Sequence, residues 1–201
     1  VFDLPFSSDT ISPITVNANY LTARFLNEEK NLQAKIKSAY KKVSEGYDVV
    51  LIDGSIEPYV GHNLGLDDFH MAKMLDAVAM PIIKADDDFQ LDLNLLYLDL
   101  WNSNKIELLG TVFSNVSQTQ INKINSIYKP LVEQKGCPVL GTTPYQSILS
   151  APTVTDFFDV LNGEVLAAPD HMNRIVEEVV VGTMTIESAL SYLRKAPNKA
   201  L

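Results

Sequence analysis

Asp53, Gly54 and Ser55 are the residues whose types and order best suit chemistry on a charged ligand. They follow the apolar run 49–52, in which three of four side chains are β-branched. Such a run is typical of a central parallel strand buried on both faces, and open α/β sheets bind ligands at the carboxyl ends of their strands. A carboxylate at that place can hold Mg²⁺, and the two small residues would let backbone N–H groups approach a phosphate.

The same three residues also fit a purely structural role. Aspartate at a strand end accepts backbone N–H bonds, and a Gly-Ser pair makes a tight turn. The G-x-x-x-x-G-K-[ST] phosphate loop that would complete a nucleotide site occurs nowhere in the 201 residues. A magnesium and phosphate site and a simple turn therefore stay open as alternatives.

The other reactive side chains predict no catalytic constellation. His62 and His70 lie eight residues apart, which is not a metal-ligand spacing, and surface or core roles are expected for all three histidines. Cys137 precedes an apolar strand and is expected to be a small buried hydrophobe. The acidic run 86–88 could bind a cation, but capping of the next helix is the favoured interpretation. No nucleophile elbow or catalytic triad is present, so no catalytic residue is predicted.

Alternating helical and strand patterns indicate how these residues are positioned. Helices are expected over 20–25, 27–44, 69–75, from the acidic run 86–88 to Trp101, and over 118–134, and strands over 49–52, 77–83, 108–113 and 138–140. Strand–helix alternation with short connections predicts a doubly wound, mostly parallel α/β sheet over residues 1–149.

The pattern changes at Ser150-Ala151-Pro152, where a second, small α/β module over residues 150–201 is expected to begin. Its predicted helices are 153–161, 171–178 and 185–193, and its predicted strands are 164–167 and 179–181. A module of roughly 50 residues buries too little surface to be stable alone. We therefore expect this module to pack against the first domain or against another chain.

Composition limits the classes of partner. The net charge of −9 argues against a nucleic-acid or anionic-membrane surface. No apolar run reaches the ~18 residues that span a bilayer, and no signal peptide is visible. The single cysteine suits a reducing compartment, so a location in the cytoplasm or in an organelle stroma or matrix is expected.

Several short segments together carry a family resemblance. The chain resembles a BioD-like (dethiobiotin synthetase-like) P-loop domain followed by the opening of a DRTGG domain, as found together in phosphotransacetylase-family proteins. The matching segments, which in their order and spacing cover nearly the whole chain, are 12–13, 47–55, 61–66, 108–116, 137–144, 149–154, 162–166 and 179–184.

The resemblance implies a P-loop NTPase-type fold that binds ATP and Mg²⁺. It implies Asp53 as the metal ligand and, as nucleotide-binding positions, Gly54, Ser55, Ser114, Asn115 and Pro144. The adenine-reading asparagine of the BioD group aligns with Ser114, and Asn115 follows one position later. The family's phosphate loop and first strand are expected to precede Val1, and its D-R-T-G-G segment to follow Leu201.

Two functions follow from this resemblance. The first is a non-catalytic regulatory or scaffold protein with a degenerate nucleotide-binding domain, similar to the regulatory front end of phosphotransacetylase-family proteins. The alternative is an ATP- and Mg²⁺-dependent BioD-like ligase whose phosphate loop lies outside these residues. In either case a homo-oligomer or a subunit of a larger protein complex is expected.

Overall fold

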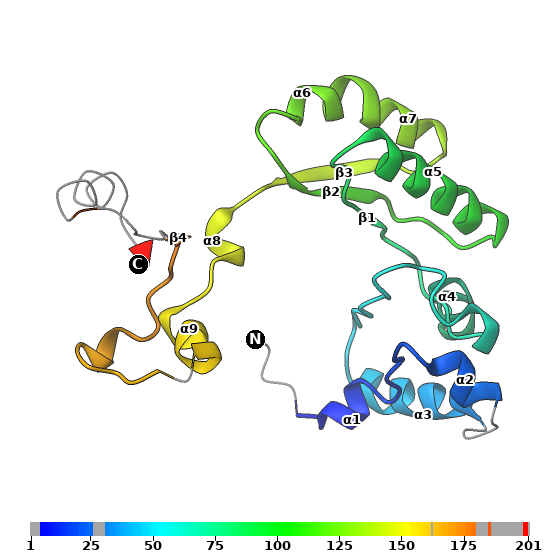
Figure 1. Cartoon of the computed structure of the whole chain (residues 1–201). Coiled ribbons are helices and arrows are strands. Elements are labelled where there is room, and N and C mark those ends of the chain that lie inside the picture. The colour runs from blue at the N-terminus through cyan, green and yellow to red at the C-terminus, as the bar shows by residue number, and fades with distance from the viewer. Residues whose placement is uncertain (1–4, 26–30, 162, 180–184, 186–198, 201) are drawn as a thin grey trace. The chain divides into compact units, whose positions relative to one another are not determined.

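The computed structural model describes residues 5–25, 31–161, 163–179, 185 and 199–200 (Figure 1). The chain divides into two compact units, Val1–Thr143 and Pro144–Leu201. The predicted domain boundary after residue 149 stays a prediction. Each unit is described by itself below.

A three-stranded sheet lies at the centre of the first unit. Its strands are β1 (Ile82–Ile83), β2 (Thr111–Val116) and β3 (Val139–Pro144), in the order β1-β2-β3. β1 and β2 run parallel, with Ile82 opposite Val112 and Ile83 opposite Phe113. The side chains of Ile83 and Phe113 are fully buried, because both point to the face that the helices cover. The fold is therefore a mixed α/β fold, as predicted.

The predicted strand 77–83 is shortened by a bulge. Ala79 pairs with Leu108 and Ile82 with Val112, so the β2 side contains one residue more between the two pairs. Gly110 lies in this extra stretch with φ 141°, a backbone conformation that favours glycine. The ladder is interrupted there, and the continuous β1 consists of two residues only.

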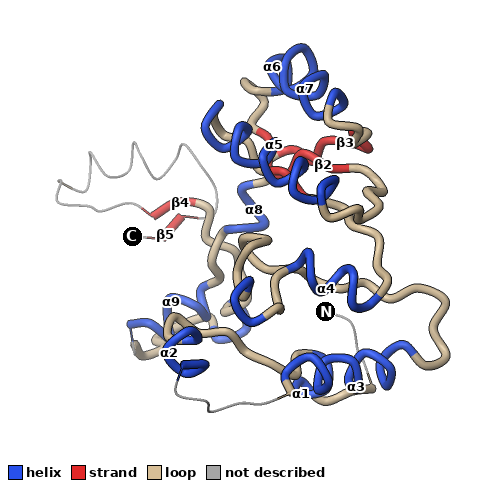
Figure 2. Tube along the Cα trace, turned by 90° about the vertical axis from the view of Figure 1, so that its right-hand side faces the viewer, coloured by secondary structure: helices blue, strands red, loops and turns tan. Residues whose placement is uncertain are grey.

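One face of this sheet is covered by α5 (Asp88–Ser103) and by a second helical segment that consists of α6 (Ile121–Lys123), the π-helical turn η2 (Ile124–Tyr128) and α7 (Lys129–Gln134) (Figures 1 and 2). They pack their apolar sides on the strands in one core cluster. The members from these helices are Leu91, Leu98, Trp101, Ile124, Tyr128 and Val132.

The π-helical turn changes which side of the helical segment 121–134 is buried. A regular helix would bury Ile127 and Leu131 together with Ile124, but both of these side chains are exposed and Val132 is fully buried. A π turn closes i→i+5 hydrogen bonds and contains more residues per turn than an α turn. The apolar face is therefore rotated beyond the turn.

The opposite face of the sheet is apolar and about half exposed. Side chains there alternate with the buried ones along the strands, and they are Val78, Met80, Ile82, Leu109 and Leu140. Parallel sheets are normally covered on both faces. The second helical layer of a doubly wound sheet stays a prediction, because the described helices that pack into the core cluster lie on one face.

The predicted buried strand 49–52 is wrong. These residues are an exposed loop, with Val49 74%, Leu51 88% and Ile52 46% exposed. An apolar run becomes a strand only where a neighbouring strand pairs with its backbone groups. Among the described residues, no strand pairs with this segment.

The remaining helices of the first unit are α1 (Ser8–Ile11), α2 (Tyr20–Phe25), α3 (Leu32–Ser44), the 3₁₀ turn η1 (His62–Leu64) and α4 (Asp68–Leu75). The predicted helices 20–25 and 69–75 are confirmed. The predicted helix 27–44 is confirmed from Leu32 onward, and α1 was not predicted.

The second unit contains α8 (Ser147–Ser150), α9 (Val154–Leu161), the 3₁₀ turn η3 (Pro169–His171) and a parallel pair of short strands, β4 (Glu178–Val179) and β5 (Lys199–Ala200). The predicted helix 153–161 is confirmed, with Thr153 at its start. The predicted helix 185–193 and most of the predicted strand 179–181 lie outside the described residues. The predicted strand 164–167 is not a strand.

The predicted helix 171–178 is also wrong beyond its first residue. An antiparallel bridge joins Ile175 to Thr153, and the N–H of Val176 donates to the carbonyl of Pro152 at 2.8 Å. These contacts hold the segment extended beside the start of α9. Pairing with a neighbouring segment thus overrides a local helical pattern.

Candidate functional site at the start of helix α4

Asp67 is the residue around which the candidate site is built. It is the N-cap of α4, and its Oδ1 accepts the backbone N–H groups of Phe69 and His70, both at 3.1 Å. A side-chain acceptor at this position satisfies N–H groups that lack partners within the helix. The sequence predicts this cap, because aspartates stand directly before the helical pattern 69–75, and the Asp67 side chain is fully buried.

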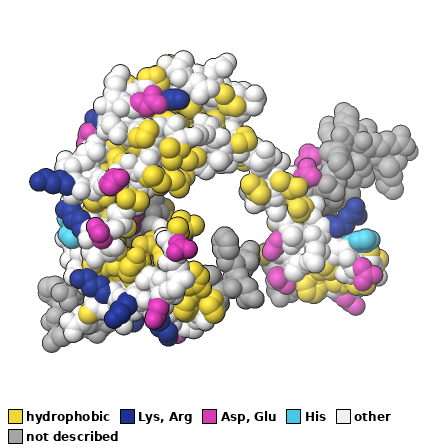
Figure 3. Space-filling view, turned by 180° about the vertical axis from the view of Figure 1, so that it is seen from behind, with side chains coloured by type: hydrophobic (Ala, Val, Ile, Leu, Met, Phe, Trp, Pro, Cys, Tyr) yellow, Lys and Arg dark blue, Asp and Glu magenta, His cyan; other side chains and the backbone are white. Residues whose placement is uncertain are grey.

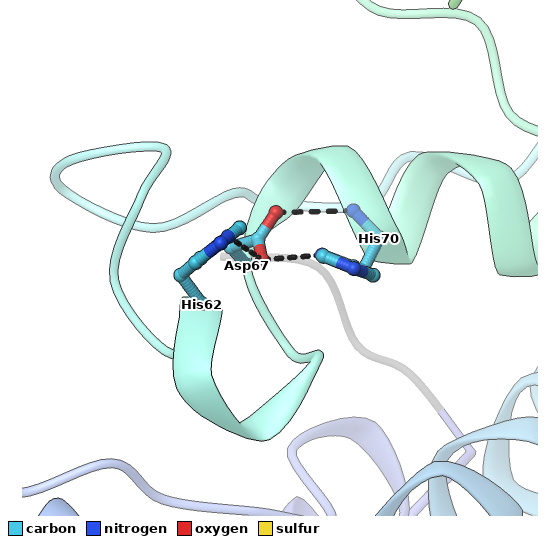
Figure 4. A group of neighbouring side chains, drawn as sticks. All are labelled: His62, Asp67 and His70. Atoms are coloured by element: carbon cyan, nitrogen blue, oxygen red, sulfur yellow. Dashed lines mark hydrogen bonds and ion pairs between the residues drawn. The ribbon is translucent and has the colours of Figure 1, made fainter. Parts of the chain in front are cut away.

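Two histidines converge on the second oxygen of Asp67 (Figure 4). Nδ1 of His62, from η1, lies 3.0 Å from Asp67 Oδ2, and Nδ1 of His70, from α4, lies 2.5 Å from the same atom. The centroids of the two imidazole rings are 5.4 Å apart. The expectation that the histidines form no constellation is therefore wrong for this pair.

The loop between η1 and α4 explains why the sequence did not show this cluster. Gly61 and Gly65 have φ values of 85° and 65°, and they turn the chain so that His62 faces the start of α4. The one local signal available was the helix-capping aspartate three residues before His70. The approach of His62 depends on the loop and could not be deduced from its spacing.

Opposing effects set the pKa of the Asp67 carboxyl. Burial acts to raise it, but hydrogen bonds from the backbone and ring of His70 and from the ring of His62 outweigh burial. The net result is a pKa below the ordinary aspartate value. Asp67 is therefore a carboxylate near neutral pH, and both Nδ1 atoms act as donors toward it.

The predicted residues Gly54 and Ser55 lie beside this cluster, where they contact Asp68. The N–H of Ser55 donates to both carboxylate oxygens of Asp68, at 3.1 and 3.2 Å. A Cβ on Gly54 would lie 2.7 Å from Asp68 Oδ2. Gly54 thus permits the close approach of the Asp68 carboxyl group. The Ser55 N–H, which was expected to contact a phosphate, already donates to Asp68.

The carboxyl group of Asp68 has a pKa above the ordinary aspartate value. Burial is the main cause that raises its pKa, and the charges of Asp67 and Asp53 raise it further, against the lowering effect of the Ser55 hydrogen bonds. Three carboxyl groups therefore gather at this end of α4. The arrangement attracts cations and repels anions.

The predicted positions Ser114 and Asn115 lie near the carboxyl end of β2, where both contact Thr143. The hydroxyl of Thr143 donates to Ser114 Oγ at 3.4 Å and accepts the N–H of Asn115 at 3.3 Å. Asn115 has φ 61°, a left-handed conformation that asparagine tolerates. Pro144 is the last residue of β3. Among the described residues, no hydrogen bond joins Ser114 or Asn115 to Asp53, Gly54 or Ser55.

The acidic run 86–88 has structural roles, as predicted. Asp87 caps α5 by accepting the N–H of Gln90 at 2.9 Å. Asp88 accepts Lys123 Nζ at 2.7 Å and the Tyr128 hydroxyl at 2.6 Å. Cys137 is fully buried, which confirms its predicted role, and burial raises the pKa of its thiol.

Comparison with known proteins finds weak similarity to phosphate acetyltransferases. The enzymes of Nitrosomonas europaea and Pseudomonas putida are each 22% identical, over 173 and 179 residues, and that of Pseudomonas aeruginosa is 20% identical over 187 residues. These matches cover 82%, 81% and 81% of this chain. They cover 25%, 24% and 25% of the relatives, so the chain spans about a quarter of their length.

These similarities relate the chain to the phosphotransacetylase family, as the resemblance in its sequence implied. No protein-family model matches the chain, and no solved structure matches it. The BioD-like and DRTGG assignments stay predictions. Among the described residues, no helix has the length and apolar character needed to cross a bilayer.

Proposed function

We propose that this chain is a non-catalytic regulatory or scaffold part of a phosphotransacetylase-related protein, with a degenerate nucleotide site. One observation carries the proposal: the carboxylate of Asp68 occupies the Ser55 N–H. A phosphate oxygen could bind that N–H only after Asp68 had left. Asp53, the predicted Mg²⁺ ligand, adds a further negative charge at the same place.

The two groups of predicted nucleotide contacts also support the proposal. Ser114 and Asn115 share Thr143 as their polar partner, and Ser55 has Asp68. Each group is satisfied by protein contacts of its own. Polar groups that already have partners must give them up before they bind a ligand, which lowers affinity.

The exposed sheet face supports a role in assembly. Its five apolar side chains are about half exposed on a sheet that contains the parallel pair β1 and β2, and such sheets are covered on both faces in proteins. Figure 3 shows hydrophobic side chains grouped on the surface between charged ones. We propose that a second copy of the chain or another subunit of a complex covers this face.

Calorimetry with ATP and Mg²⁺ tests the degenerate nucleotide site. We expect no binding at millimolar nucleotide and no phosphate release from ATP by the 201-residue chain. The matched variant is Asp53→Ala, which removes the predicted metal ligand and should leave both results unchanged. Magnesium-dependent turnover that disappears in Asp53→Ala would support the ligase alternative.

Light scattering across a concentration series tests the assembly role. We expect the chain to associate, and we expect Ile82→Glu to shift it toward monomer, because a charge on an apolar contact face carries a large desolvation cost. Phe89→Glu is the control, since Phe89 is 86% exposed on α5, away from the sheet face. A monomer at every concentration, with no partner that copurifies, would contradict the assembly role.

A further inference from the structure

His62, Asp67 and His70 present three potential ligand atoms that all lie within 4.8 Å of one another. We propose that these side chains bind one transition-metal ion of the Zn²⁺ or Co²⁺ type, with a fourth coordination position open to water or to a small ligand. The three ligand residues are not among the predicted nucleotide contacts, although Gly54 and Ser55 contact the neighbouring Asp68.

The geometry needs only a small adjustment to admit the ion. At metal–ligand distances of about 2.0–2.2 Å, two ligands in a tetrahedral site lie about 3.3 Å apart. The two Nδ1 atoms lie 3.0 and 2.5 Å from Asp67 Oδ2, so these two separations would widen by about 0.3 and 0.8 Å on metal binding. The imidazole side chains are 65% and 48% exposed, which leaves them room to move.

The donor set selects the class of metal. Two imidazole nitrogens and one carboxylate oxygen suit Zn²⁺, Co²⁺ or Ni²⁺, whereas Mg²⁺ and Ca²⁺ prefer oxygen ligands alone. In the hydrogen-bonded arrangement, the Nδ1 atom of each ring carries the hydrogen that faces Asp67. On metal binding that hydrogen leaves Nδ1, the ring takes up a proton on Nε2, and the freed Nδ1 lone pair binds the ion.

The surroundings of the three ligands are also arranged for a cation. Asp67 is buried, and its other oxygen is fixed by the N–H groups of Phe69 and His70, which orient the carboxylate as outer-shell contacts do in metal sites. Asp68 and Asp53 add negative charge nearby. In the absence of a metal ion, hydrogen bonds from the two rings hold the histidines against Asp67. Metal binding would replace the Nδ1 hydrogens of both rings with the ion.

A titration of the metal-free chain with Co²⁺ tests whether the three residues bind a metal ion. The chain contains three histidines and one cysteine, and the cysteine is buried, so competing sites are few. We expect visible ligand-field absorption that saturates at one Co²⁺ per chain and is displaced by Zn²⁺. His62→Gln and His70→Gln should each weaken binding by at least about tenfold, since loss of even an outer-shell partner costs 10- to 100-fold.

Two controls keep the experiment decisive. His171→Gln removes the third histidine, which lies in the other unit, and should leave the affinity unchanged. Asp67→Asn keeps an N-cap acceptor for α4 but removes the ligand charge, so it should lose the metal while circular dichroism shows an intact fold. Absence of a one-to-one complex in the unaltered chain would overturn the proposal, and so would unchanged affinity in folded His62→Gln and His70→Gln.

Discussion

The ring of Phe69 packs on the ring of Trp101, with centroids 4.5 Å apart and planes at 58°. Tilted aromatic pairs at this distance contribute favourable energy beyond the area that they bury. Phe69 follows the capping aspartate of α4, and Trp101 lies near the end of α5. This contact therefore ties the candidate site to the helical layer over the sheet.

Removal of the Phe69 ring should destabilise the first unit. Phe69→Ala leaves a cavity beside Trp101 in the core cluster, and we expect the free energy of unfolding to fall by about 3–5 kcal/mol. Trp101 is the only tryptophan, so its fluorescence in a urea titration gives the measurement directly. Phe89→Ala, at an exposed position of α5, should change stability by no more than about 0.5 kcal/mol.

Cys137 should be protected from thiol reagents in the folded chain. The side chain is fully buried and burial raises its pKa, so both access and the thiolate fraction are reduced. We expect a disulfide reagent to modify it only as fast as the unit opens, and rapidly in denaturant. Reaction of the native chain at the rate of a free thiol would show that this part of the core is open.

The contacts of Asp88 predict a dependence of stability on pH. Hydrogen bonds from Lys123 and Tyr128 hold its pKa below the ordinary aspartate value. A carboxyl whose pKa is lower in the folded state stabilises that state above its unfolded pKa of about 3.9, and this stabilisation is lost as the pH falls through the folded pKa.

Asp88→Asn tests this dependence. We expect the variant to lose stability near neutral pH and to approach the unaltered chain as the pH is lowered below about 4. Urea titrations at a series of pH values give the comparison. Asp92→Asn, on the same helix, is the matched control. A constant difference between Asp88→Asn and the unaltered chain at all pH values would show that the contacts to Lys123 and Tyr128 do not act through charge.

In the second unit, Thr153 and Asp156 form a reciprocal cap at the start of α9. Thr153 Oγ1 accepts the N–H of Asp156 at 3.2 Å, and Asp156 Oδ2 accepts the N–H of Thr153 at 2.7 Å. Thr153→Ala should cost about 1 kcal/mol, within the range of 0.5–2 kcal/mol for lost N-caps. Faster amide exchange in the first turn of α9 is the measurement, and Asp159→Asn, an exposed change farther along the helix, should leave that exchange unaltered.

Local signals in the sequence predicted local structure well. The caps at Asp67, Asp87 and Thr153 were predictable because an N-cap depends on a side chain and the next two or three N–H groups. The buried leucines of α5 followed from their helical spacing. The mixed α/β class followed from the alternation of helical and strand patterns.

Features that depend on distant partners could not be predicted in this way. Residues 49–52 have the composition of a buried strand, but no described strand supplies the hydrogen bonds that they would need. The segment after His171 is extended because it pairs with the start of α9. His62 contacts Asp67 because the loop turns at Gly61 and Gly65. The sequence predicts turns at these glycines but not the direction in which the chain continues after them.

The contact between Gly54 and Asp68 has a consequence for how this sequence can diverge. Since a Cβ at position 54 would lie 2.7 Å from Asp68 Oδ2, a larger residue there requires the Asp68 side chain to shift or to be replaced by a shorter one. Conversely, once Asp68 is lost, the restriction on position 54 disappears. Substitutions at positions 54 and 68 are therefore expected to covary among related sequences.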